Sequence, residues 1–197
     1  MESLEKIWKI NVNQIIVVVN ILVFLSLEII GDTENAMFLY EHGAMHPVGV
    51  FKEGEWYRLF TCMFLHFGIH HLGNNMILLF FLGNQLEDMV GHIKYLILYV
   101  LSGLSGSIVS MICMIKQQEY AVSAGASGAV YGVIGALLYV VIRNKGRVKD
   151  LTIGRFLFML VLSLYHGFTA TGVDNFAHIG GLISGFLLCI VLYRKKG

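Results

Sequence analysis

The sequence predicts an all-α, polytopic membrane protein built as a bundle of six transmembrane helices. Of its 197 residues, 56% are hydrophobic and only 14% are charged, and the mean hydropathy is +0.71. Apolar runs of about 17–25 residues, the length a helix needs to cross hydrocarbon, recur along the chain. A soluble domain of this size has too little interior to bury so much apolar surface, so we expect lipid to solvate it.

Six apolar runs are candidate spans, and the connections between them are too short to form a second domain. We therefore expect a single domain over residues 1–197. The approximate limits of the runs are 12–30, 66–86, 93–115, 126–142, 153–169 and 176–193. The longest connection, 31–65, contains Trp56, Tyr57 and Phe60. Aromatic side chains are enriched at membrane interfaces, so we expect this loop to rest there.

The runs differ in what they contain besides apolar residues. The first is long and lacks a small-x-small cleavage site, so we expect an anchor rather than a cleaved signal peptide. The second carries His71 and Asn75 near its start. The fourth and sixth open on glycine-rich stretches that hold Ser127 and His178. The fifth is rich in phenylalanine.

Lysine and arginine predict the orientation, because loops that carry them stay in the cytoplasm. With the N-terminus inside, 11 of the 14 fall on the cytoplasmic side and three, Lys52, Arg58 and Lys116, fall outside. The sequence thus predicts a multi-pass protein of the cell membrane with both termini cytoplasmic.

This topology places three polar residues at one depth. The second, fourth and sixth runs all pass from outside to inside, and His71, Ser127 and His178 each lie near the start of one of them. At a rise of about 1.5 Å per residue, all three belong in the outer part of the bilayer. We therefore expect a site that faces the outer side.

Ser127 is a candidate nucleophile within the G-x-S-G pattern of residues 125–128. A serine hydroxyl is weak by itself and needs an adjacent base. The glycines permit a sharp turn and close helix approach. The helix start also offers unpaired N–H groups that favour an oxyanion. The alternative is that these small residues only pack helices, and the pattern alone would not exclude it.

His178 is the candidate base, because an imidazole inside a membrane is costly and indicates function. Gly181 and Gly185 follow on the same helical face, and the fourth run has a similar glycine face. Small residues at this spacing let two helices touch backbone to backbone. That contact would bring His178 within hydrogen-bonding reach of Ser127, and Tyr131, four residues after the serine, is expected to pack against the imidazole.

His71 and Asn75 form an i, i+4 pair on one face of the second run. Both side chains carry N–H donors suited to the negative oxygen of a tetrahedral intermediate. The alternative is a polar pair that joins helices by hydrogen bonds. Alongside Ser127 and His178, the oxyanion hole is the better interpretation.

Other residues indicate no metal, cofactor or nucleic acid. The histidines lack an H-E-x-x-H pattern, so no metal site is expected. A net charge of +1 without a basic face disfavours nucleic acid as a partner. The three cysteines lie far apart in or beside apolar runs and are expected to be small buried hydrophobes. Asp174 is either a third member of a catalytic triad or, as we favour, a carboxylate at a helix start.

Three motifs in this order on alternate spans carry a family resemblance. They are H-x-x-x-N at 71–75, G-x-S-G at 125–128 and A-H-x-x-G-x-x-x-G at 177–185. The chain resembles the rhomboid intramembrane serine proteases in their six-span bacterial form, from the first loop to the sixth span. Gly83 and Glu87 also fit the family's pattern.

The resemblance implies a rhomboid-like bundle and a Ser127–His178 dyad that needs no acid. It further implies an oxyanion hole made by the Ser127 N–H, His71 and Asn75. The implied activity is cleavage of transmembrane protein substrates near the outer face of the bilayer, with no cofactor. The family's first loop usually carries adjacent Trp-Arg, whereas this chain has Trp56-Tyr57-Arg58.

Two other functions compete with this interpretation. A catalytically silent rhomboid-like protein would bind transmembrane clients without cutting them, but such proteins usually lack the serine or the histidine. A small transporter or channel would use intramembrane polar residues as a pathway. Here those residues gather near one face and do not continue to the other, which favours the protease.

Overall fold

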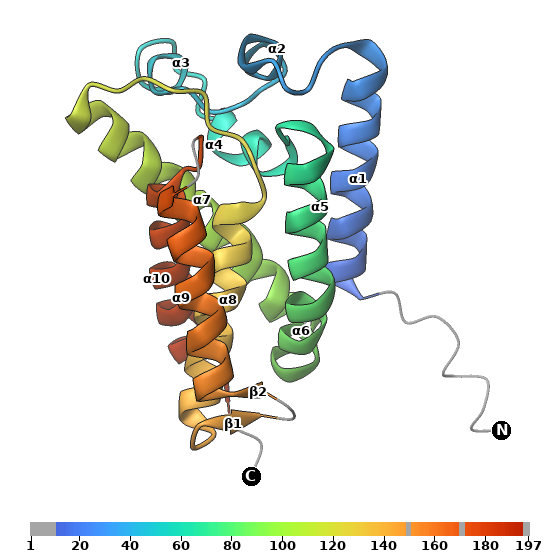
Figure 1. Ribbon diagram of the computed structural model, residues 1–197, viewed down its shortest axis with the longest axis vertical. Coiled ribbons are helices and arrows are strands. Elements are labelled where there is room, and N and C mark those ends of the chain that lie inside the picture. Colours follow the sequence, from blue (N-terminus) through green and yellow to red (C-terminus); the bar gives the residue numbers. More distant parts are fainter. Residues whose placement is uncertain (1–10, 149–150, 170–171, 195–197) are drawn as a thin grey trace, which may run out of the picture.

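A computed structural model of the chain describes residues 11–148, 151–169 and 172–194. Long helices run alongside one another, and short helices gather at one end of them (Figure 1). The elements are α1 (Val12–Ile30), α2 (Ala36–Glu41), α3 (Pro47–Phe51), α4 (Arg58–Thr61), the 3₁₀-helix η1 (Cys62–Phe64), α5 (Gly68–Leu78), the π-helix η2 (Leu79–Gly83), α6 (Asn84–Val90), α7 (His92–Gln117), α8 (Ser127–Arg143), β1 (Arg147–Val148), β2 (Leu151–Thr152), α9 (Ile153–Thr169) and α10 (Asn175–Leu192).

The helix limits agree with the apolar runs to within a few residues. Within the described ranges, three helices have the length and apolar composition to cross a membrane, namely α1, α7 and α10. α8 is apolar but shorter. The second run differs most from its prediction, because α5, η2 and α6 follow one another without a break as far as Val90, where Gly91, with a φ of +88°, starts the turn into α7.

Apolar side chains cover much of the outer surface of the bundle. On α1, α7 and α10, Ile29, Ile93 and Val191 are each more than three-quarters exposed. α8 is instead buried along most of its length, between α7 and α10. An apolar exterior around a packed interior is the arrangement that a lipid solvent favours.

A buried carboxylate joins α1 to α6 at the end opposite the short helices. Glu87 accepts hydrogen bonds from the backbone N–H groups of Val12 (2.7 Å) and Asn13 (2.8 Å), at the start of α1. The Asn13 side chain in turn donates to the carbonyl of Leu79 (2.8 Å). Carboxylates at a helix N-terminus satisfy its unpaired N–H groups, so this contact fixes where α1 begins.

The connection 31–65 is folded into short helices rather than being an irregular loop. Asn35 caps α2 by accepting from the N–H groups of Met37 and Phe38. Pro47 occupies the first position of α3, where a missing N–H costs nothing. Trp56 and Phe60 are exposed, and their predicted place at the membrane interface stays a prediction.

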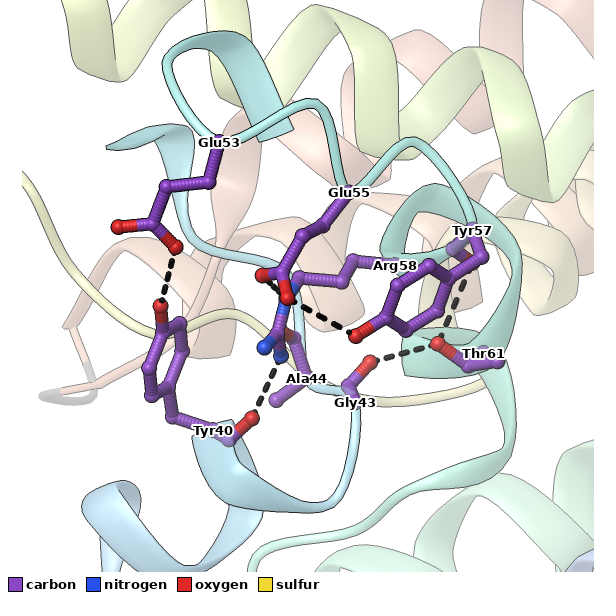
Figure 2. Close-up of polar contacts among 8 residues, drawn as sticks. All are labelled: Tyr40, Gly43, Ala44, Glu53, Glu55, Tyr57, Arg58 and Thr61. Carbon is purple, nitrogen blue, oxygen red and sulfur yellow. Dashed lines mark hydrogen bonds and ion pairs between the residues drawn. The ribbon is translucent and has the colours of Figure 1, made fainter. Parts of the chain in front are cut away.

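Arg58 holds this loop together, and Figure 2 shows its contacts. The guanidinium is buried and donates to the Glu55 carboxylate (2.5 Å) and to the carbonyls of Tyr40 (2.5 Å) and Ala44 (3.1 Å). It also lies 4.2 Å from the centre of the Tyr40 ring. The hydrogen bond from Arg58 lowers the pKa of the Glu55 carboxyl below its ordinary value. One buried cation therefore joins three parts of the loop.

A small β-hairpin departs from the all-α prediction. β1 and β2 pair antiparallel, with Arg147 opposite Thr152 and Val148 opposite Leu151. The hairpin lies between α8 and α9, at the end of the bundle away from α2 and α3 (Figure 1). It turns the chain between two long helices and leaves the helical architecture unchanged.

Candidate active site

All four predicted site residues line one cavity of about 910 Å³. His71 and Asn75 reach it from α5, Ser127 from the start of α8 and His178 from α10. The segment that precedes α8 and the turn that precedes α10 complete its wall. Residues more than 100 positions apart in the sequence therefore face a common space.

Ser127 is the first residue of α8. Two residues before it, Gly125 has a backbone conformation that other residues rarely adopt. Gly125 has a φ of +142°, and a Cβ placed there would lie 2.8 Å from the His71 ring and 3.5 Å from Ser127 Oγ. A side chain at this position would therefore displace the imidazole. The N–H of Ser127 belongs to the first turn of α8, where such groups have no acceptor within the helix.

His178 is buried, and its ring stacks on Tyr131. The two ring centroids are 4.1 Å apart at an interplanar angle of 11°, which confirms the predicted packing. The Tyr131 hydroxyl contacts Ser163 Oγ at 2.6 Å, so α9 supports the same stack. His178 Nδ1 has no hydrogen-bond partner, and no hydrogen bond joins this ring to the Ser127 hydroxyl across the cavity.

The helices that carry the serine and the histidine touch through their backbones. A Cβ on Gly181 would overlap the carbonyl of Gly128, and a Cβ on Gly185 would overlap that of Gly132. This confirms the predicted glycine contact between α8 and α10. Since Gly181 lies one turn after His178, and Gly128 directly follows Ser127, the contact sets the separation of the two side chains.

His71 and Asn75 retain donors that point to a role at the cavity. His71 Nδ1 accepts a hydrogen bond from the Phe67 N–H at 3.3 Å. In a neutral ring the proton therefore sits on Nε2, the nitrogen that faces Gly125. Asn75 is buried and donates one amide hydrogen to the carbonyl of His71 at 3.1 Å. Its second amide hydrogen stays available to a ligand.

His66 also belongs to this region, and its contacts there were not predicted from the sequence. The Ala126 N–H donates to His66 Nε2 at 3.4 Å, and the ring meets His71 edge-on, with centroids 5.2 Å apart. Side chains three or four residues apart meet on a helix face, whereas these two histidines are five apart and His66 precedes α5. No sequence pattern therefore relates the two. In the described ranges, no three His, Cys, Asp or Glu side chains gather around one point as metal ligands would.

Asp174 lies at the start of α10, as favoured from the sequence. Its Oδ1 accepts from the Ala177 N–H at 3.0 Å, and Oδ2 accepts from the hydroxyls of Ser110 (2.5 Å) and Ser123 (2.6 Å). Cys62 and Cys189 are buried, as expected, and Cys113 is half-buried.

Comparison with known proteins gives a consistent result. A profile of the rhomboid domain matches residues 53–195. The rhomboid protease GluP of Bacillus subtilis (strain 168) is 39% identical over 181 residues, which are 91% of this chain and 34% of that protein. RHOMBOID-like protein 5 of Arabidopsis thaliana is 43% identical over 146 residues, 73% of this chain and 46% of that protein.

A third relative is nearer in length to this chain. The putative rhomboid protease YdcA of B. subtilis is 32% identical over 143 residues, 73% of this chain and 70% of that protein. The chain spans less than half the length of GluP and of RHOMBOID-like protein 5. Because the domain profile and these alignments cover most of its residues, the chain belongs to the rhomboid family.

Proposed function

We propose that this chain is an intramembrane serine endopeptidase that cleaves transmembrane segments of membrane proteins near the outer face of the cell membrane. One observation carries the proposal. Ser127 and His178 come from distant parts of the sequence and open onto one cavity, and their helices are in backbone contact. Sequence similarity to proteins named as rhomboid proteases supports the proposal.

In the proposed reaction, His178 is the general base and Ser127 the nucleophile. The imidazole takes the hydroxyl proton while the oxygen attacks the scissile carbonyl. The tetrahedral intermediate collapses to an acyl-enzyme, and His178 gives the proton to the leaving amine. Water then attacks the ester with the same imidazole as base, which releases the acid and restores the serine. Stacking on Tyr131 supports this role, because it limits the orientations open to the ring.

The negative oxygen of both intermediates would be bound by three donors. These are the Ser127 N–H, His71 Nε2 and the second amide hydrogen of Asn75. Such donors act most strongly where water is excluded and where they are already aimed at the developing charge. The hydrogen bond from Phe67 to His71 supports the assignment, since it leaves the proton of a neutral imidazole on Nε2, the nitrogen that faces Gly125.

The membrane setting follows from the same proposal. Six helical segments, α1, α5–η2–α6, α7, α8, α9 and α10, would cross the bilayer as one domain over 1–197, with both termini cytoplasmic. A transmembrane substrate would enter sideways from the lipid. It must unwind locally, because a helical peptide bond is shielded by its own hydrogen bonds. No metal or cofactor takes part in these steps.

Active-site labelling tests the assignment. A fluorophosphonate should label Ser127 of the protein in liposomes, and the same preparation should cut a transmembrane reporter. His178→Ala should abolish both labelling and cleavage because the base is lost. Ser26→Ala, a hydroxyl removed from the exposed face of α1, is the control and should retain both. Cleavage by a folded Ser127→Ala protein would contradict the proposal.

A further inference from the structure

We propose that Asp174 is a positioning residue that holds the segment leading to Ser127 against the start of the helix that carries His178. Its catalytic consequence rests on the proposed function, whereas its structural consequence does not. The inference comes from the contacts of one carboxylate, which reach three elements around the cavity.

The first contact fixes the start of α10. Asp174 Oδ1 accepts from the Ala177 N–H at 3.0 Å, and the N–H of His178 donates to the Asp174 carbonyl at 3.2 Å. Side-chain caps of this kind satisfy N–H groups that have no partner within the helix. Asp174 therefore orients the turn of backbone from which the His178 side chain projects.

The second oxygen reaches two other parts of the chain. Asp174 Oδ2 accepts from Ser110 Oγ on α7 (2.5 Å) and from Ser123 Oγ in the segment before α8 (2.6 Å). Ser123 lies four residues before Ser127, and its backbone exchanges two hydrogen bonds with Met45 in the loop 31–65 (2.8 and 2.9 Å). Through Ser123, the carboxylate connects the His178 helix to the segment that precedes Ser127 and to the loop 31–65.

These contacts separate Asp174 from the acid of a Ser-His-Asp triad. A triad acid accepts from the imidazole, but His178 Nδ1 has no hydrogen-bond partner, and both Asp174 oxygens are engaged elsewhere. Ser110 is fully buried, so removal of the carboxylate would leave a buried hydroxyl without this acceptor. Asp174 acts through the positions of other residues and does not touch the reacting atoms.

Substitutions of Asp174 by alanine and by asparagine separate the effect of its hydrogen bonds from that of its negative charge. Asp174→Ala removes all three side-chain hydrogen bonds. Asp174→Asn keeps an oxygen for the Ala177 N–H and an amide that donates to a serine oxygen, since a hydroxyl can donate or accept. Ser110→Ala/Ser123→Ala removes the same cross-links from the other side and leaves the helix cap intact. Asp32→Asn, a carboxylate that accepts from a backbone N–H in the outer loop, is the control.

The catalytic readout is the rate at which fluorophosphonate labels Ser127, together with kcat and KM for a transmembrane reporter. A displacement of about 1 Å can cost on the order of 100-fold in rate. We expect Asp174→Ala and the double serine variant to lose about 10-fold to 100-fold in labelling rate and kcat with little change in KM. Asp174→Asn should recover most of the activity. An unchanged rate in folded Asp174→Ala, or no recovery in Asp174→Asn, would overturn the inference.

A second readout does not depend on the proposed function. In hydrogen–deuterium exchange, Asp174→Ala should speed exchange at residues 122–126 and 175–178 together, because one carboxylate protects both segments. The double serine variant should affect mainly 122–126. If wild type is not labelled at Ser127, the proposed function fails while this readout still decides the role of Asp174. If both segments of Asp174→Ala exchange at the same rate as in the wild type, the positioning role of Asp174 is refuted.

Discussion

At the scale of single residues, two polar side chains of the site, His71 and Asn75, each make one hydrogen bond within the protein and keep a donor available to a ligand. Asn75 donates one amide hydrogen to the carbonyl of His71. His71 Nδ1 accepts a hydrogen bond from the Phe67 N–H. Each contact fixes a side chain at the wall of the cavity while a second donor stays available. Preorganised donors of this kind lower a barrier because they need not reorient as charge develops.

Asn75 gives a direct test of the oxyanion hole. Asn75→Ala removes the free donor, and we expect kcat to fall on the order of 10-fold to 10³-fold, the upper figure being the loss of one full oxyanion donor. KM should change little if the contact forms only in the transition state. Steady-state cleavage in liposomes measures both. Asn75→Asp, which replaces the amide donor by a carboxyl acceptor, should lose at least as much, and wild-type kcat in both variants would remove Asn75 from the hole.

Glu55 predicts a pH effect on the stability of the loop 31–65. The pKa of its carboxyl lies below the ordinary value of 4.5 because Arg58 donates a hydrogen bond to it. A carboxyl with a lowered folded-state pKa stabilises the protein above its unfolded-state pKa, and that stability disappears as pH falls through the folded-state value. Glu55→Gln should therefore lower the Tm at neutral pH, and the difference from wild type should shrink as pH falls below 4.5.

Thermal unfolding followed across pH measures this difference. The matched control is Glu41→Gln, on the exposed face of α2, which should not reproduce the pattern. A Tm difference for Glu55→Gln that stays constant or grows toward acid would contradict the ion pair with Arg58.

At the scale of elements, the contact between α8 and α10 determines whether the serine and the histidine face each other. Gly181 packs on the backbone of Gly128, and Gly185 on that of Gly132. Backbone atoms cannot rotate away as a side chain can, so any added Cβ must push the helices apart. In lipid, where apolar surface provides no net drive for helices to associate, such close packing is a main source of stability.

Gly181→Ala tests that contact. We expect a loss of about 1–3 kcal/mol in unfolding free energy from overpacking, with a large fall in the rate at which fluorophosphonate labels Ser127. Gly154→Ala is the control, because a Cβ there meets nothing within 4 Å. That control should hold or raise stability by up to about 1 kcal/mol through helix propensity. Equal stability and labelling for the two variants would show that the glycine contact is not what sets the helix separation.

At the scale of the whole molecule, surface apolarity and charge distribution are consistent with a protein in a bilayer. Exposed apolar side chains line α1, α7 and α10. The short helices of the loop 31–65 and the β1–β2 hairpin lie at opposite ends of the bundle (Figure 1). Lysine and arginine predict that the hairpin end is cytoplasmic, because the hairpin lies in the most basic connection between helices.

Cysteine accessibility tests this orientation. Glu41→Cys, at the loop end, should react with a membrane-impermeant maleimide in intact cells. Lys145→Cys, at the hairpin end, should react only after permeabilisation. The unsubstituted chain, with Cys62 and Cys189 buried, gives the background signal. The reverse pattern would invert the proposed topology.

The helical segments and the glycine contact were predictable from sequence. In lipid a backbone must satisfy its own hydrogen bonds, so an apolar run of sufficient length has few options besides a helix. That is why the predicted limits agree with α1 and α10 to within a residue. The spacing of Gly181 and Gly185 is likewise a property of one helix face, and it identified the surface on which α10 meets α8.

The contacts of Asp174 with two serines, the contact of His66 with Ala126, and the compact fold of the loop 31–65 came only from the three-dimensional arrangement. Asp174 meets Ser110 and Ser123 across separations of 64 and 51 residues, and His66 meets Ala126 across 60. No periodicity relates such positions, because each bond depends on where several helices and a loop end relative to one another. Helices follow from local hydrogen bonding and hydropathy, whereas polar partners that are distant in sequence are chosen only when the whole bundle packs.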